Sequence, residues 1–209
     1  MSDPVTAPNA SADDSSSTPP PVPKVVNVAT TLKRKVDDLA FGLKGYEVVG
    51  LSPGKIDELA SNDAERLLND KKARCQAVLG KSSNATVFED TKLSFVKDGK
   101  DLVWPSYDVT RLNSIKPLIE WAKFLGCTRA KYCCSAILEM PDGRSFFFTV
   151  TRDVTMCERQ PGEGAIDPFT IPDGSDKAYS EMTEEERAAF HARAELARLI
   201  VVKLHELGY

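Results

Sequence analysis

Three adjacent polar residues offer the chemistry of a metal site. Glu89, Asp90 and Thr91 directly follow the apolar segment 86–88, which has the length and composition of a short strand. Polar side chains can converge where a strand ends, and Mg²⁺ takes one or two protein carboxylates together with waters and substrate phosphates. The pattern therefore indicates a magnesium site, and an ordinary polar strand end is the alternative.

A cationic turn between an expected strand at 25–29 and an expected helix at 32–43 offers a phosphate site. The three cations at 33–35 oppose the helix macrodipole, which favours negative charge at a helix start by roughly 0.3 to 1 kcal/mol per group. A bound anion would remove this conflict, because backbone N–H groups and the Thr30 hydroxyl could join the cations in holding a triphosphate. A solvated basic turn is the alternative interpretation.

The last expected helix carries a cation and a histidine on one face. Arg187 and His191 are four residues apart, so an unbroken helix brings their side chains together. In the same helix Arg193 points about 100° away from position 192, since one turn takes 3.6 residues. A solvated helix histidine is the alternative to a functional one.

The remaining pattern predicts a mixed α/β fold with an antiparallel portion. We expect strands at 25–29, 86–88, 93–96, 132–138, 145–150 and 154–158, and helices at 32–43, about 62–78, 115–125 and 183–207. The turn Pro141-Asp142-Gly143 joins two of these strands as a hairpin. Thr183 and Glu186 form a capping box that opens the last helix.

Composition limits the possible partners. With 209 residues, 42% of them hydrophobic, the chain can bury one core, so we expect one domain at 24–209 after a disordered Ser/Pro-rich tail at 1–23. A net charge of −4 without a long basic block argues against nucleic acid, and the absence of an apolar run of about 18 residues argues against membrane insertion. Five cysteines without a Cys-x-x-Cys pair predict reduced thiols in an intracellular, most simply cytoplasmic, protein, with an organelle as the alternative.

Two motifs resemble those of the inosine triphosphate pyrophosphatase family. Glu89, Asp90, Thr91 and Leu93 match its Glu-Asp-Thr-x-Leu motif, and the segment 167–182, with Asp-Pro-Phe and Pro-Asp-Gly, matches its C-terminal half. The resemblance extends from about 25 to 207. It implies an α/β single domain with an elongated mixed β-sheet flanked by helices, which commonly forms a homodimer. It also implies Mg²⁺-dependent hydrolysis of non-standard purine nucleoside triphosphates, such as ITP and XTP, to the monophosphate and pyrophosphate.

The resemblance assigns roles to individual residues. Asp90 would be the catalytic residue, activating water, and the metal ligands would be Glu58, Asp90 and Thr91. The nucleotide would be bound by Thr30, Lys35, Lys72, Asp167, Arg187 and His191.

Several departures from the family lie at positions that would face the nucleotide. They are Thr31, Leu32, Gly164, Ile166, Phe190 and Ala192. Loss of a stacking aromatic at 164–166 could remove roughly 1 to 3 kcal/mol of base binding. Two hypotheses follow: a divergent pyrophosphatase, favoured by the retained carboxylates, or a non-catalytic descendant that acts as a nucleotide-binding regulator or as a structural subunit of a larger complex.

Overall fold

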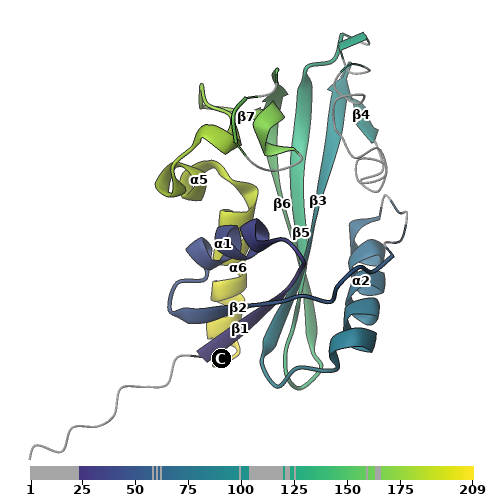
Figure 1. Ribbon diagram of the computed structural model, residues 1–209, viewed down its shortest axis with the longest axis vertical. Coiled ribbons are helices and arrows are strands. Elements are labelled where there is room, and N and C mark those ends of the chain that lie inside the picture. The colour runs from purple at the N-terminus through teal and green to yellow at the C-terminus, as the bar shows by residue number, and fades with distance from the viewer. Residues whose placement is uncertain are drawn as a thin grey trace, which may run out of the picture.

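One mixed sheet runs through the molecule and carries helices on both faces (Figure 1). The computed structural model describes residues 24–57, 59, 61, 63–98, 100–103, 120, 123–124, 126–158, 160–162 and 166–209. The tail at 1–23 and most of the expected helix at 115–125 lie outside the described residues. The domain boundary at residue 24 therefore stays a prediction.

The sheet has seven strands in the order β2-β1-β3-β5-β6-β7, with β4 beside β3. The strands are β1 Lys24–Ala29, β2 Tyr46–Leu51, β3 Ala85–Lys97, β4 Lys100–Val103, β5 Arg129–Glu139, β6 Ser145–Met156 and β7 Thr170–Pro172. Strand β1 is parallel to β2 and β3, and the other pairs are antiparallel. This arrangement confirms the expected mixed sheet with an antiparallel portion.

Helices cover the two faces of the sheet unequally (Figure 1). They are α1 Lys33–Gly42, α2 Ala64–Leu79, α5 Glu184–Phe190 and α6 Ala192–Glu206, with short 3-10 turns η1 Asp167–Phe169 and η2 Tyr179–Glu181. Helices α1 and α6 pack together and bury Leu39 and Ile200 against one face, and α2 buries Leu68 against Phe88 on the other. Burial of these apolar side chains stabilises both layers, at about 25 cal/mol per Å² removed from water.

In two places, two strands that were predicted separately form one long strand. Strand β3 pairs with β5 from Thr86 to Phe95, so the polar residues 89–91 lie inside a strand and not at its end. The prediction that the strand ends before residue 89 is therefore wrong. The hydrogen bonds between β3 and β5 continue through residues 89–91 and satisfy their backbone groups, whatever side chains they carry. Likewise, 145–150 and most of 154–158 belong to β6, which ends at Met156, and β2 was not expected from the sequence.

The expected helix at 183–207 is broken at one residue. His191 has φ −78° and ψ 131°, an extended conformation, and it separates α5 from α6. The capping box at the start of α5 is confirmed, since the Thr183 hydroxyl accepts a hydrogen bond from Glu186 N and the Glu186 carboxylate accepts one from Thr183 N.

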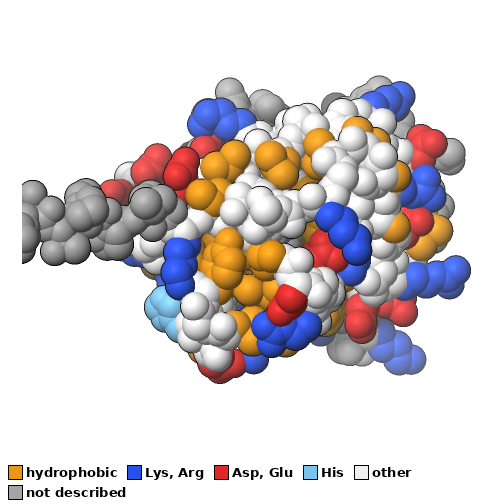
Figure 2. All heavy atoms as spheres, turned by 90° about the horizontal axis from the view of Figure 1, so that it is seen from below, with side chains coloured by type: hydrophobic (Ala, Val, Ile, Leu, Met, Phe, Trp, Pro, Cys, Tyr) orange, Lys and Arg blue, Asp and Glu red, His pale blue; other side chains and the backbone are white. Residues whose placement is uncertain are grey.

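Surface features bear on possible partners. In the described part of the chain, no helix is long and apolar enough to cross a membrane. The five cysteines are all free thiols. Figure 2 shows that acidic and basic side chains are interspersed with hydrophobic ones on the lower end of the molecule.

Candidate functional site

Seven charged side chains of alternating sign meet between α1, the C-terminal helices and the sheet. In order of contact they are Lys35, Glu89, Arg193, Asp38, Arg187, Asp167 and Arg34, and we call them the charge ring. Arg34 and Lys35 are adjacent in α1, so the two ends of the series are linked through the backbone of this helix. The Arg34 side chain is 28% exposed, and every other member is at most 12% exposed.

At one end of the ring, Glu89 is held by two cations. Lys35 Nζ lies 2.8 Å from one carboxylate oxygen, and Arg193 Nε donates to the other at 2.9 Å. The Thr91 hydroxyl donates to Glu89 at 2.8 Å and accepts from Arg193 Nη2 at 2.7 Å. The polar groups of Glu89 and Thr91 are thus engaged within the fold.

At the other end of the series, three side chains contact the Asp167 carboxylate. Its carboxylate lies 3.1 Å from Arg187 Nη2 and 3.3 Å from Arg34 Nη2, and Tyr132 OH donates to it at 3.2 Å. The η1 turn that carries Asp167 is thereby joined to α1, α5 and β5.

The pKa shifts follow from these contacts. Burial by itself opposes the ionisation of Glu89, but Arg193 and Lys35 outweigh it and hold the pKa of Glu89 well below its ordinary value. Burial also opposes the ionisation of Asp167, and the neighbouring His191 and the arginines hold its pKa low as well. Burial disfavours charge on Lys35, yet Glu89 and Asp90 raise its pKa. Glu89, Asp167 and Lys35 are therefore ionised at neutral pH.

The break at His191 brings its imidazole to the ring. Nδ1 accepts a hydrogen bond from Arg193 N at 3.2 Å, which assigns the neutral-form proton to Nε2. Nε2 lies 4.0 Å from Asp38 and 3.9 Å from Asp167, and it has no hydrogen-bond partner among the described residues. Burial lowers the pKa of His191, so its imidazole is neutral at pH 7. The same break turns Arg193 toward Glu89, where an unbroken helix would have pointed it away.

Asp90 lies on the opposite face of β3 from Glu89 and Thr91, because successive side chains of a strand alternate. It lines a small hollow beside α2 with Ser61, Ala64, Leu67, Lys92, Cys133 and Ser135. Lys35 Nζ and Lys71 Nζ lie 3.9 and 3.8 Å from its carboxylate. The predicted metal residues Asp90 and Thr91 are therefore not brought together on one face.

The two adjacent lysines of α2 differ in position. Lys71 is buried, and its Nζ donates to the backbone oxygen of Glu89 at 2.9 Å. Lys72, the residue expected at the nucleotide, instead lies 3.6 Å from Glu139 and donates to Ser145 Oγ at 3.1 Å. One residue turns a helical side chain by about 100°, which explains the separation.

Thr30 lies between β1 and α1, where its N–H donates to Leu51 O at 2.9 Å and its hydroxyl accepts from Leu32 N at 3.2 Å. It therefore lies directly before α1, and its role at the nucleotide stays a prediction. Glu58, the second expected metal ligand, lies outside the described residues, as does Gly164.

Two sets of side chains offer oxygen or nitrogen donors for a divalent cation. Asp38, Asp167 and His191 have ligand atoms within 4.8 Å of one another. However, Arg187 Nη2 already lies within 3.1 Å of both carboxylates, so these groups bind a guanidinium and fit a metal poorly. Asp90, whose side chain is 17% exposed, fits better, because Mg²⁺ requires few protein carboxylates and keeps its waters.

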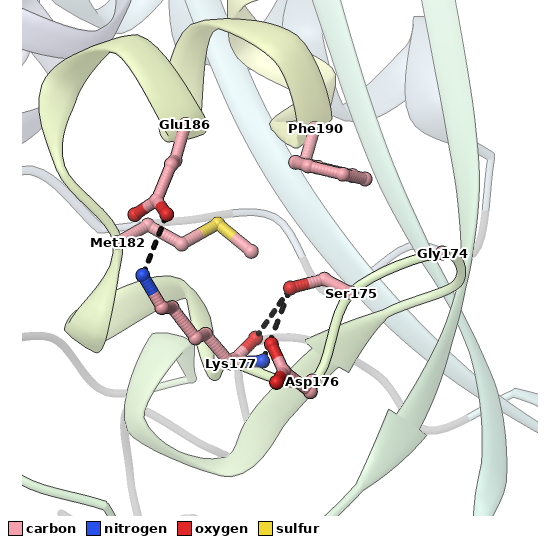
Figure 3. A pocket seen from close by; sticks show the side chains of 7 residues that line it. All are labelled: Gly174, Ser175, Asp176, Lys177, Met182, Glu186 and Phe190. Atoms are coloured by element: carbon pink, nitrogen blue, oxygen red, sulfur yellow. Dashed lines mark hydrogen bonds and ion pairs between the residues drawn. The ribbon is translucent and has the colours of Figure 1, made fainter.

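A separate surface hollow of about 450 Å³ lies between the loop after β7 and α5 (Figure 3). It is lined by Gly174, Ser175, Asp176, Lys177, Met182, Glu186 and Phe190. Lys177 Nζ donates to Glu186 at 2.6 Å, and Met182 and Phe190 supply apolar surface. Phe190 thus faces this hollow, and the hollow contains no member of the charge ring.

Two residues of the site were not singled out from the sequence, namely Asp38 and Lys71. A usable signal exists for Asp38, since it follows Arg34 by four residues on α1, a spacing that places both on one face. Lys71 has no such signal, because only packing distinguishes it from Lys72.

No family model matches the chain, but it is similar to several known proteins and solved structures. A dITP/XTP pyrophosphatase from Hyperthermus butylicus is 30% identical over 191 residues, which cover 88% of this chain and 97% of that protein. The Staphylococcus aureus Ham1 protein has a TM-score of 0.63 and 18% identity, and a HAM1 protein from Coxiella burnetii has a TM-score of 0.67 and 15% identity. Both structures cover 88% of this chain and are themselves covered to 99%, which supports the same fold.

Proposed function

Because the chain belongs to the family of dITP/XTP pyrophosphatases, which are nucleotide pyrophosphatases, we propose that it hydrolyses non-standard purine nucleoside triphosphates. The substrates would include ITP and XTP, and the products would be the nucleoside monophosphate and pyrophosphate. The observation that best supports this proposal is the Asp90 carboxylate, which is partly exposed and has Lys35 Nζ and Lys71 Nζ within 4 Å. We also propose that the protein acts as a homodimer.

In this proposal the phosphates bind beside Asp90. Lys35 and Lys71 neutralise phosphate charge from α1 and α2, and Thr30 supplies a hydroxyl at the helix start. Lys71 thereby takes the role expected for Lys72. Asp167, Arg187 and His191 would contact the nucleotide at the other end of the ring.

Mg²⁺ would be held by Asp90, with Glu58 as the second proposed ligand, and when bound it would polarise the phosphate oxygens. Asp90 would orient the attacking water. The new bond joins the water oxygen to the α-phosphorus, the bond from this phosphorus to the bridging oxygen breaks, and pyrophosphate leaves.

One observation favours the second hypothesis, a non-catalytic nucleotide-binding or structural role. His191 is 1% exposed, and Arg187 is already bound to Asp38 and Asp167. Nucleotide contact by these side chains therefore requires the ring to rearrange.

A pyrophosphate-release assay decides between the two functions. Purified protein with Mg²⁺ is given ITP, XTP, dITP and the ordinary triphosphates, and we expect release from at least one purine analogue. The Asp90→Asn variant should lose activity by about 100-fold or more, because it removes the charge that holds the metal.

Asp142→Asn is the matched control, since Asp142 lies in the exposed β5–β6 turn with Arg144 as its partner. It should keep full activity. A wild type that releases no pyrophosphate but gains thermal stability with nucleotide would establish the regulator instead. Full activity in Asp90→Asn would exclude the proposed catalytic role of that residue.

A further inference from the structure

Asp38 connects the two halves of the charge ring. Its side chain is 8% exposed, and its oxygens accept hydrogen bonds from both arginines that flank the break at His191. Arg187 donates from Nε at 3.1 Å and from Nη2 at 2.8 Å, and Arg193 donates from Nη1 at 2.8 Å. One carboxylate of α1 thus ties together α5 and α6.

Each arginine that binds Asp38 has its other partner at a different end of the ring. Arg193 donates to Glu89, which is adjacent in β3 to Asp90. Arg187 donates to Asp167 in the η1 turn. A displacement of Asp38 would therefore alter both ends, although Asp38 lies at neither.

The hydrogen bonds that Asp38 accepts from Arg187 and Arg193 are charge-assisted and buried. They therefore form only within a narrow range of distances and angles. Hydrogen bonds between ionised partners are about twice as strong as neutral ones, and the fork of a guanidinium fixes direction as well as distance. Arg187 uses Nε and Nη2 on the same Asp38 oxygen and Nη2 again on Asp167. Arg187 Nη1 also donates to the Tyr179 backbone oxygen at 2.5 Å, so its orientation is set jointly by η2 and by α1, a helix whose first turn also carries Lys35.

We propose that Asp38 is a positioning residue that couples recognition of the base to the phosphate end of the site. It holds Arg187 against Asp167 and Arg193 against Glu89, so that one arrangement of α5 and α6 serves both ends. This inference rests on the proposed function and assigns a role to a residue that does not itself touch the reacting atoms.

Selectivity between bases provides the test. We expect Asp38→Asn to lower the ratio of kcat/KM for the preferred purine triphosphate to that for ATP by about tenfold, within the usual range for coupling between sites. A merely structural role would reduce kcat/KM for both nucleotides by the same factor, because it changes only the folded fraction. An unchanged ratio would therefore overturn the inference, as would a wild type with no base preference.

The neighbouring Asp37 supplies the matched control. It is adjacent on α1 but exposed, with Lys33 as its partner at 2.7 Å, so Asp37→Asn should leave the ratio unchanged. If Asp38→Asn does not fold, Asp38→Glu carries the test, since it keeps the charge but moves it by one methylene. A lowered ratio is expected there as well, and a ratio equal to that of the wild type would contradict the inference. A wild type without pyrophosphate release would refute the proposed function itself, which is a different outcome.

Discussion

Lys71 and Lys72 are adjacent on α2, yet their ammonium groups lie in different parts of the molecule. Lys71 Nζ is 3.8 Å from Asp90, whereas Lys72 Nζ is 3.6 Å from Glu139. A cation near the proposed phosphate site stabilises charge that develops there, and a cation elsewhere does not. The pair therefore offers a test with its own control.

We expect Lys71→Met to lower kcat/KM for the preferred triphosphate by about tenfold or more, and Lys72→Met to change it by less than about twofold. Steady-state kinetics of pyrophosphate release measure both, with thermal melting to confirm that each variant is folded. Equal losses in the two variants would show that the position of Lys71 has no bearing on the reaction.

Among the elements, the C-terminal residue joins two parallel strands. Tyr209 OH donates to Val25 O at 2.7 Å in β1 and accepts from Ala85 N at 3.0 Å in β3. Its own backbone oxygen accepts from Tyr46 OH in β2 at 2.9 Å. The chain end thus supplies hydrogen bonds where the strands begin.

Tyr209→Phe should therefore destabilise the protein by about 1 to 3 kcal/mol, because it leaves the N–H of Ala85, a buried residue, without its partner. Tyr46→Phe, which loses a single hydrogen bond to a partly exposed group, should cost about 1 kcal/mol or less. Urea unfolding monitored by circular dichroism measures both free energies. A Tyr209→Phe protein as stable as the wild type would exclude this role for the hydroxyl.

On the scale of the whole molecule, the charge ring makes stability depend on pH. The pKa of Glu89 and that of Asp167 are lower in the folded chain than their ordinary values of 4.5 and 3.8. The unfolded chain then binds more protons in acid, so the contribution of these two carboxylates to stability is fully present above about pH 5 and is lost as pH falls. His191, whose pKa is lowered from 6.5, acts in the same direction from a higher pH.

We expect the free energy of unfolding to fall by roughly 2 kcal/mol or more between pH 7 and pH 3, the scale of one strongly paired buried carboxylate. Urea titrations at pH 7, 5, 4 and 3 measure this loss. A Glu89→Gln variant should be less stable at pH 7 and lose less on acidification. Constant stability over the range would contradict the role of the ring.

Several elements of this protein follow from local patterns in its sequence. Apolar residues at strand and helix spacing predicted β1, α1, α2 and the β5–β6 hairpin, and the Thr183 capping box predicted the start of α5. The motif around Asp90 and the segment 167–182 also identified the family, which the comparisons confirm.

Only the tertiary structure decided which side chains meet. Continuous pairing with β5 kept Asp90 and Thr91 inside one strand, and alternation then separated them onto opposite faces. The extended backbone of His191 turned Arg193 into the ring, although helical periodicity had pointed it elsewhere. Asp38 belongs to the ring because it accepts hydrogen bonds from Arg187 and Arg193, which are 149 and 155 residues away in the sequence. Local spacing determines elements because hydrogen bonding and burial act over a few residues, whereas the site depends on how distant elements pack.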